Sequence, residues 1–189
     1  TRSMIMKKWD VIETIYIYKN PFGNLRVDKC LLPNGNMIEK YYVNEYPDWV
    51  NIVAITSDKK MLFVKQYRHG CKEFFLEIPA GGIKENEDTH IAILRELREE
   101  TGYISDQEPV LLGDFYTNPA LANNKVKTYI LLDIYKKFDQ HTDDTEEIEY
   151  MLFSFDKINE MIKLGQINQM FTVTAYCLAK NYLEKKGWL

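Results

Sequence analysis

Three glutamates, Glu96, Glu99 and Glu100, stand close together in a stretch with the spacing of an amphipathic helix. Each residue of an α-helix advances about 100° around the axis, so Glu96 and Glu100 lie about 40° apart and Glu99 about 60° to the other side of Glu96. Three carboxylates on one arc repel one another, and a hard divalent cation with oxygen ligands relieves that repulsion. The arc therefore predicts a metal site. The alternative for this short stretch alone is an ordinary solvated helix face with ion pairs.

The residues around this stretch predict where its helix begins and ends. Asp88 is a suitable N-cap and Gly102 a suitable residue just beyond the last turn. Before the helix, the strand expected over Phe74–Ile78 ends at residues 79–82, Pro-Ala-Gly-Gly, where neither strand nor helix continues easily. The carboxylates are thus expected on a helix that follows a glycine-rich loop.

The rest of the chain alternates between β-type and helical patterns. Asn34-Gly35 suits a tight hairpin. The strands are expected at Val11–Tyr18, Leu25–Leu32, Met37–Val43, Val50–Thr56, Met61–Gln66, Val110–Tyr116, Val126–Asp133 and Ile148–Phe155. Strands with a few helices between them predict the α/β class, an α/β/α sandwich with a β-rich N-terminal segment. We expect the N-terminal segment at residues 1–45 and the main domain at 46–189.

Two further helices are expected near the C-terminus. Asp156 can cap a helix that runs through Leu164 and is closed by Gly165. Asn168 can cap a longer last helix. Its predicted core-facing residues, at spacings of three and four, are Met170, Phe171, Thr174, Leu178 and Tyr182.

Composition narrows the class of protein. With 189 residues, 46% of them hydrophobic, the chain can bury one substantial core. The net charge of −4 offers no basic excess for a nucleic-acid polymer, and no apolar run approaches the ~20 residues that span a bilayer. Cys30, Cys71 and Cys177 are far apart, which favours reduced thiols and a cytoplasmic protein.

Fixed residue types recur around the acidic stretch at fixed offsets. Gly81 is followed after five residues by Glu87, then after seven by Arg95-Glu96-Leu97-x-Glu99-Glu100-x-Gly102-Tyr103. This pattern matches the Nudix box, with Tyr103 in place of the usual aliphatic residue, and the chain resembles the Nudix hydrolases. The likeness to their ADP-ribose pyrophosphatase branch rests on Gln66-Tyr67-Arg68, Glu77-Ile78-Pro79-Ala80-Gly81 and Pro119.

The resemblance implies roles for individual residues. Glu96, Glu100 and the main-chain carbonyl of Ala80 would hold Mg²⁺, for which Mn²⁺ can substitute. Glu99 would share a metal or orient water, and Arg95 would form ion pairs within the box. By the same resemblance, Arg68 would contact substrate phosphate, Glu77 would support the site, and Pro119 would lie near the sugar.

The resemblance also implies a catalytic base on a late acidic loop. Matching Glu146-Glu147-Ile148-Glu149 to the branch's pattern indicates Glu146 as the base, with Glu147 second. The metals would neutralise the pyrophosphate and lower the pKa of an attacking water, whose proton a carboxylate accepts. The alternative is an acidic surface loop without catalytic function. His69, His90 and His141 lack ligand spacing and are interpreted as incidental.

Several substrates and functions remain open. ADP-ribose, cut to AMP and ribose 5-phosphate, is the first substrate implied. However, Pro119 is followed by Ala120 rather than by glycine and an acidic residue, so another nucleoside diphosphate sugar such as GDP-mannose stays open. A non-catalytic Nudix-fold binding module is a second class. An isopentenyl diphosphate isomerase would need a catalytic cysteine, and Cys71 lies in no matching motif.

The first predicted strand bears on the oligomeric state. Val11–Tyr18 carries apolar residues on both faces, which suits a strand covered on each side. In the branch that the chain resembles, N-terminal strands exchange or pack across a two-fold axis. A homodimer is therefore expected.

Overall fold

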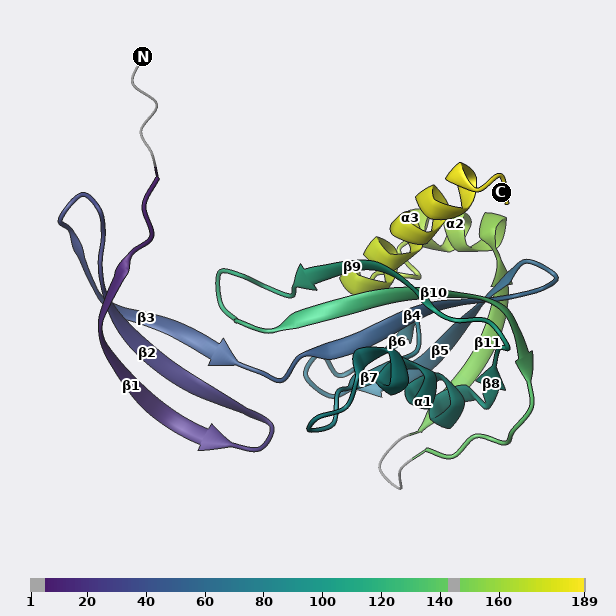
Figure 1. The fold of residues 1–189 in the computed structure, drawn as a ribbon, viewed down its shortest axis with the longest axis horizontal. Coiled ribbons are helices and arrows are strands. Elements are labelled where there is room, and N and C mark those ends of the chain that lie inside the picture. The colour runs from purple at the N-terminus through teal and green to yellow at the C-terminus, as the bar shows by residue number, and fades with distance from the viewer. Residues whose placement is uncertain (1–5, 143–146, 189) are drawn as a thin grey trace, which may run out of the picture. The chain divides into compact units, whose positions relative to one another are not determined.

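The computed structural model describes residues 6–142 and 147–188, in which the chain forms two compact units (Figure 1). The first unit comprises residues 1–48 and 116–125, and the second comprises residues 49–115 and 126–189. Among the described helices, none is both long and apolar enough to cross a membrane. The three cysteines are free.

The first unit is a three-stranded antiparallel sheet, β1 (Asp10–Asn20), β2 (Gly23–Leu31) and β3 (Met37–Glu45), in chain order. The predicted turn at Asn34-Gly35 joins β2 to β3. Gly35 has a φ of +84°, and its N–H donates to the Leu32 carbonyl at 2.9 Å. Because L-residues rarely adopt this φ, the glycine sets the turn.

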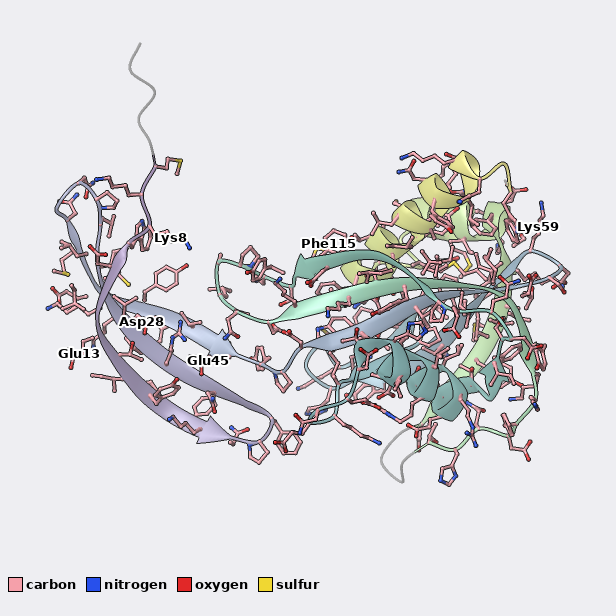
Figure 2. All side chains as sticks on the ribbon, in the orientation of Figure 1. Lys8, Glu13, Asp28, Glu45, Lys59 and Phe115 are labelled. Carbon is pink, nitrogen blue, oxygen red and sulfur yellow. The ribbon has the colours of Figure 1, made fainter. Side chains whose placement is uncertain are left out.

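One face of this sheet carries a polar network. Asp28 is buried and accepts hydrogen bonds from the Thr14 hydroxyl at 2.7 Å and from the Arg26 guanidinium at 3.1 Å. Arg26 also pairs with Glu45, which accepts from the Asn24 amide at 3.2 Å. Figure 2 labels Asp28 and Glu45 on these strands. The network satisfies a carboxylate that would otherwise be costly to bury.

In the single chain both faces of the first strand are exposed, so the expectation that a second copy covers them stays a prediction. β1 is exposed along its whole length, and the side chains of Val11, Ile12, Ile15 and Ile17 are each more than half exposed. β1 is also an edge strand of its sheet, and among residues 6–142 and 147–188 no strand pairs with its outer backbone N–H and C=O groups.

The second unit is built on an eight-stranded mixed sheet. Its main path runs β11-β5-β4-β10-β8, with β6 on β5, β7 on β4 and β9 on β10. β4 and β10 pair in parallel, whereas the pairs β10–β8, β11–β5, β4–β5, β4–β7 and β5–β6 are antiparallel. The strands are β4 (Trp49–Thr56), β5 (Lys60–Arg68), β6 (Glu73–Glu77), β7 (Ala80–Gly82), β8 (Tyr103–Ile104), β9 (Val110–Tyr116), β10 (Lys125–Lys136) and β11 (Ile148–Ser154).

Helices pack against both faces of this sheet, so the predicted α/β/α sandwich is confirmed. Alternate residues of β4 point to opposite sides. Val50, Ile52 and Ala54 share a core cluster with α1 (Thr89–Thr101), whereas Val53 and Ile55 share another with α2 (Phe155–Lys163) and α3 (Met170–Lys185). Figure 2 labels Lys59 at the tip of the β4–β5 hairpin.

Residues 80–82 form a strand, contrary to the prediction that none continues there. β7 pairs antiparallel with the start of β4, with Asn51 opposite Ala80 and Trp49 opposite Gly82. Pro79 ends β6, but its carbonyl accepts from the Ile52 N–H at 3.0 Å and guides the chain onto β4. The pairing of β7 with the start of β4 thus fixes the position of the glycine-rich loop.

The predicted N-caps of the C-terminal helices are wrong, and the predicted face of α3 is only half-buried at Phe171, Leu178 and Tyr182. Ser154, not Asp156, caps α2, and Gln169, not Asn168, caps α3. The buried residues of α3 are Thr172, Ala175, Tyr176, Ala179 and Leu183. The predicted Met170 is largely exposed. The buried face includes Thr172, Ala175 and Ala179, which a pattern that counts only large apolar residues misses.

Candidate active site

The acidic helix α1 is held by its two caps. Asp88 accepts from the His90 N–H at 2.8 Å at the N-terminus, as predicted. Gly102 ends the helix at a φ of +70°, and a Cβ there would lie 2.0 Å from the Phe138 carbonyl oxygen. Leu97 and Ile93 bury the opposite face of the helix. These constraints fix the helix rotation and therefore the direction in which the carboxylates point.

The three glutamates differ in exposure. Glu100 is 5% exposed and accepts from the Ala80 N–H at 3.2 Å. The Glu96 side chain is 16% exposed, whereas that of Glu99 is 40% exposed. The hydrogen bond between Glu100 and the Ala80 N–H joins the helix directly to strand β7, which also carries the Ala80 carbonyl.

These residues line one hollow of about 490 Å³. It brings together the predicted metal-site residues with parts of the glycine-rich loop. The lining comprises Ala80, Gly81, Gly82, Ile83, Lys84, Arg95, Glu96, Glu99, Glu100 and His141.

Gly81 leaves room for a carboxylate. A Cβ at this position would lie 2.0 Å from the Glu96 carboxyl carbon and 2.3 Å from both of its oxygens. At Gly82, by contrast, a Cβ would meet nothing within 4 Å. The Glu96 carboxylate therefore occupies the space that a side chain at position 81 would need.

We expect Gly81→Ala to lower kcat by about 10–100-fold, because the methyl group displaces the Glu96 carboxylate from the hollow. Since Glu96 is a flexible side chain, the thermal midpoint in EDTA should stay close to that of the wild type. Steady-state kinetics and thermal unfolding measure the two effects. Gly82→Ala is the matched control, and equal activity of the two variants would show that Glu96 can sit elsewhere.

Arg95 is the counter-ion of the acidic arc. It makes a two-point contact with Glu87, Nε to Oε1 at 2.8 Å and Nη2 to Oε2 at 2.9 Å. Its Nη1 donates to Glu96 at 2.7 Å and to Glu99 at 3.0 Å, and its Nη2 donates to the Gly82 carbonyl at 3.1 Å. One guanidinium therefore ties the helix to the loop and offsets the mutual repulsion of the carboxylates.

These contacts shift the ionisation of the pair. Hydrogen bonds from Arg95, and then from the Lys84 backbone N–H, lower the pKa of Glu87 to about 2. The hydrogen bonds to Glu87 raise the pKa of Arg95 above its ordinary value. Because the pKa of Glu87 falls on folding, this pairing stabilises the fold above about pH 4.5 and is lost as pH falls towards 2.

The donor set fits a hard divalent cation, since carboxylate oxygens and a main-chain carbonyl are the ligands such ions prefer. In the arrangement described here, Glu96 and Glu99 are turned to Arg95. Accordingly, no group of three carboxylate, histidine or cysteine side chains among residues 6–142 and 147–188 is already gathered for a metal. A metal ion at Glu96 would share or replace its contact with Arg95.

Arg68 and Glu77 form a second ion pair on the same unit. The guanidinium of Arg68 contacts both carboxylate oxygens, Nε to Oε1 at 3.0 Å and Nη2 to Oε2 at 2.7 Å. Glu77 is buried, whereas the Arg68 side chain is 46% exposed. Glu77 thus orients a guanidinium that remains accessible to an anion.

The other predicted residues are placed as follows. Pro119 lies in the first unit, in a turn where Leu121 N–H donates to the Asn118 carbonyl at 2.9 Å. Glu147 is exposed, just before β11. Glu146 lies outside the described residues. For all three, the predicted roles stay predictions.

Sequence reasoning did not assign four of the lining residues to the site: Gly82, Ile83, Lys84 and His141. His141 was interpreted as incidental, but its backbone N–H donates to the Glu99 carbonyl at 2.9 Å. The other histidines lie elsewhere, with His90 paired to Glu108 at 2.6 Å and His69 beside Tyr67. No spacing in the sequence links His141 to α1, because a long stretch of chain separates them.

An α/β/α sandwich in which an acidic helix contacts a glycine-rich loop is typical of hydrolases that act on pyrophosphate compounds. A family model described as the NUDIX domain matches residues 46–172, and one described as the nucleoside diphosphate sugar hydrolase N-terminal domain matches residues 9–44. The chain therefore belongs to the Nudix family, as a hydrolase of its ADP-ribose pyrophosphatase-like branch.

Similar proteins support this placement. A methanol dehydrogenase activator of Bacillus methanolicus is 33% identical, over 87% of this chain and 88% of the relative. An ADP-ribose pyrophosphatase of Bacillus subtilis is 29% identical, over 90% and 89%. One of Saccharomyces cerevisiae is 31% identical, over 96% and 80%. A crystal structure of an ADP compounds hydrolase has the same fold, with a TM-score of 0.88, 19% identity and coverage of 99% and 100%.

Proposed function

We propose that this protein hydrolyses the pyrophosphate bond of a nucleoside diphosphate sugar in the presence of Mg²⁺. Its preferred substrate would be ADP-ribose, which it would cleave to AMP and ribose 5-phosphate. The observation that carries the proposal is the hollow at α1, where Glu96, Glu99 and Glu100 meet the backbone of Ala80. The ADP-ribose pyrophosphatases among the relatives support the choice of substrate.

Glu96, Glu100 and the Ala80 carbonyl would hold the metal, and Glu99 would share it or orient water. When bound, the ion neutralises pyrophosphate oxygens and lowers the pKa of an attacking water. The protein's own contribution is to fix these ligands. Glu100 is held by the Ala80 N–H and Glu96 by Arg95.

Other residues would bind the substrate and accept the proton. Arg68, held by the buried Glu77, presents a guanidinium that suits a phosphate oxygen. We propose Glu146 as the base, with Glu147 second. Pro119 is proposed near the sugar, where Ala120 replaces the usual glycine.

A panel of nucleoside diphosphate sugars tests the proposal. ADP-ribose, ADP-glucose, GDP-mannose and UDP-glucose are incubated with protein and Mg²⁺, and a phosphatase then releases phosphate only from cleaved products. We expect the greatest kcat/KM for ADP-ribose, no turnover in EDTA, and recovery with Mg²⁺ or Mn²⁺. Preference for GDP-mannose would change the substrate but keep the reaction. Tight binding by calorimetry without turnover would indicate the binding module instead, and full turnover in EDTA would refute the metal site.

We also propose a homodimer formed through the first unit. The exposed apolar side chains of β1 and its unpaired edge favour pairing with a second copy. Light scattering at micromolar concentration should give about twice the chain mass of 22.4 kDa. Ile15→Lys, which places a charge on the exposed strand, should shift the mass towards that of the single chain. A single-chain mass for the wild type would contradict the proposal.

A further inference from the structure

The C-terminal end of α1 is capped by a segment distant in the sequence. The last carbonyls of an α-helix have no partner inside the helix. Here the four consecutive carbonyls from Glu99 to Gly102 all accept hydrogen bonds from residues 136–141. The donors are His141 N–H to Glu99 at 2.9 Å, Gln140 Nε2 to Glu100 at 2.6 Å, Lys136 Nζ to Thr101 at 2.7 Å, and the N–H groups of Lys137 and Phe138 to Gly102 at 3.1 Å.

Two of these donors also reach β11: Lys136 Nζ lies 4.2 Å from the centroid of the Tyr150 ring, and Gln140 makes a hydrogen bond to the strand backbone. The Gln140 side-chain Nε2 also donates to the carbonyl of Ile148 at 3.1 Å. Ile148 is the first residue of β11, which pairs with β5. A glutamine amide has two N–H donors, so both are used. One side chain thereby joins the end of α1, the segment that follows β10, and the start of β11.

The helix turn that Gln140 holds is the turn that carries the carboxylates. The Glu100 carboxylate accepts from the Ala80 N–H, while the Glu100 carbonyl accepts from Gln140. The carbonyl of Glu99 is held in the same way by the backbone of His141. A shift of this turn would move both carboxylates relative to Ala80.

We propose that Gln140 is a positioning residue for hydrolysis, which holds the last turn of α1 against β11 so that Glu99 and Glu100 keep their places beside Ala80. The inference rests on the proposed function. The hydrogen bonds of the Gln140 side chain to described residues go to backbone carbonyls, those of Glu100 and Ile148. Gln140 acts through the Glu100 backbone, and displacements on the order of 1 Å are enough to cost ~10²-fold in rate.

Three substitutions separate this role from simple packing. Gln140→Met keeps the length of the side chain but has no donor. Gln140→Glu points carboxylate oxygens at two carbonyl oxygens. Gln140→Lys retains N–H donors and should restore function. Gln107→Met is the matched control, because Gln107 also donates from Nε2, to Asp133 at 2.5 Å, on the same unit away from the hollow.

We expect the Met and Glu variants to lower kcat by about 10–100-fold with KM within about two-fold, and Lys to recover most of the loss. Mn²⁺ affinity, measured by paramagnetic resonance without substrate, should weaken by about 10-fold for Met. Amide hydrogen exchange should rise at residues 99–102 and 148–150 in the Met variant and stay unchanged in the Gln107 control.

The experiments distinguish a failure of the inference about Gln140 from a failure of the proposed function. Normal kcat, Mn²⁺ affinity and exchange in Gln140→Met would overturn the inference. A loss of activity that Lys does not restore, with Mn²⁺ affinity unchanged, would also overturn it and indicate packing alone. If the wild type cleaves no nucleotide sugar, the proposed function fails. Mn²⁺ affinity and exchange then still decide whether Gln140 positions the carboxylates.

Discussion

Glu100→Gln is expected to reduce hydrolysis by more than about 100-fold, because it removes a proposed metal ligand, and changes in residues behind such ligands already cost 10–100-fold. The fold should tolerate the change. The amide oxygen of glutamine can still accept from the Ala80 N–H, and one of three clustered negative charges is removed. The thermal midpoint in EDTA should therefore be unchanged or raised, while the increase produced by Mg²⁺ should shrink.

The control for this variant is Glu160→Gln. Glu160 lies on α2, across the sheet from α1, where it pairs with Lys157 at 2.8 Å. Its replacement should leave both kcat and the Mg²⁺-dependent midpoint unchanged. A Glu100→Gln protein that is strongly destabilised in EDTA yet active would show that Glu100 supports the fold rather than the reaction.

Glu146→Gln is expected to lower kcat by about 10²–10⁴-fold with KM nearly unchanged, since a general base contributes to the rate rather than to binding. Glu147→Gln should lose much less. Steady-state kinetics of the two single variants and the double variant, with Mn²⁺ affinity as a check on the metal site, measure these effects.

The outcome also tests the register of the acidic loop. If the two single variants exchange their effects, the match to Ile148 and Glu149 is off by one residue. If the double variant keeps near-normal kcat, the base is elsewhere. Glu99 then becomes the candidate, because its 40% exposed side chain lies in the hollow and contacts Arg95 at 3.0 Å.

Local spacing was enough to predict the acidic helix. Asp88 and Gly102 cap α1 as expected, because capping depends on side-chain type and φ within a few residues. The offsets from Gly81 to Gly102 likewise placed the predicted metal-site residues around one hollow. The order of strands and helices was enough to predict the α/β/α class.

What the sequence did not show depends on contacts between distant segments. Gln140 and His141 reach α1 only because β10 returns beside β8 and the helix end. β7 exists because Ala80 finds a partner in Asn51, despite a local preference against strands. In α3, Ala175 and Ala179 are buried in the core whereas Met170 is largely exposed, so residue size and hydrophobicity alone did not identify the buried face.

The parallel pairing of β4 with β10 affects the order in which the parts of the second unit fold. Every element from β5 to β9, including α1, lies between these two neighbours in the chain. Pairing β4 with β10 closes a long loop. The chain between them loses conformational entropy before the two strands gain contacts, so this pairing forms slowly relative to the local hairpins. The stretch that holds Gln140 directly follows β10. We therefore expect the site to close only after the centre of the sheet has formed, because the cap at the end of α1 is built from the stretch that follows β10.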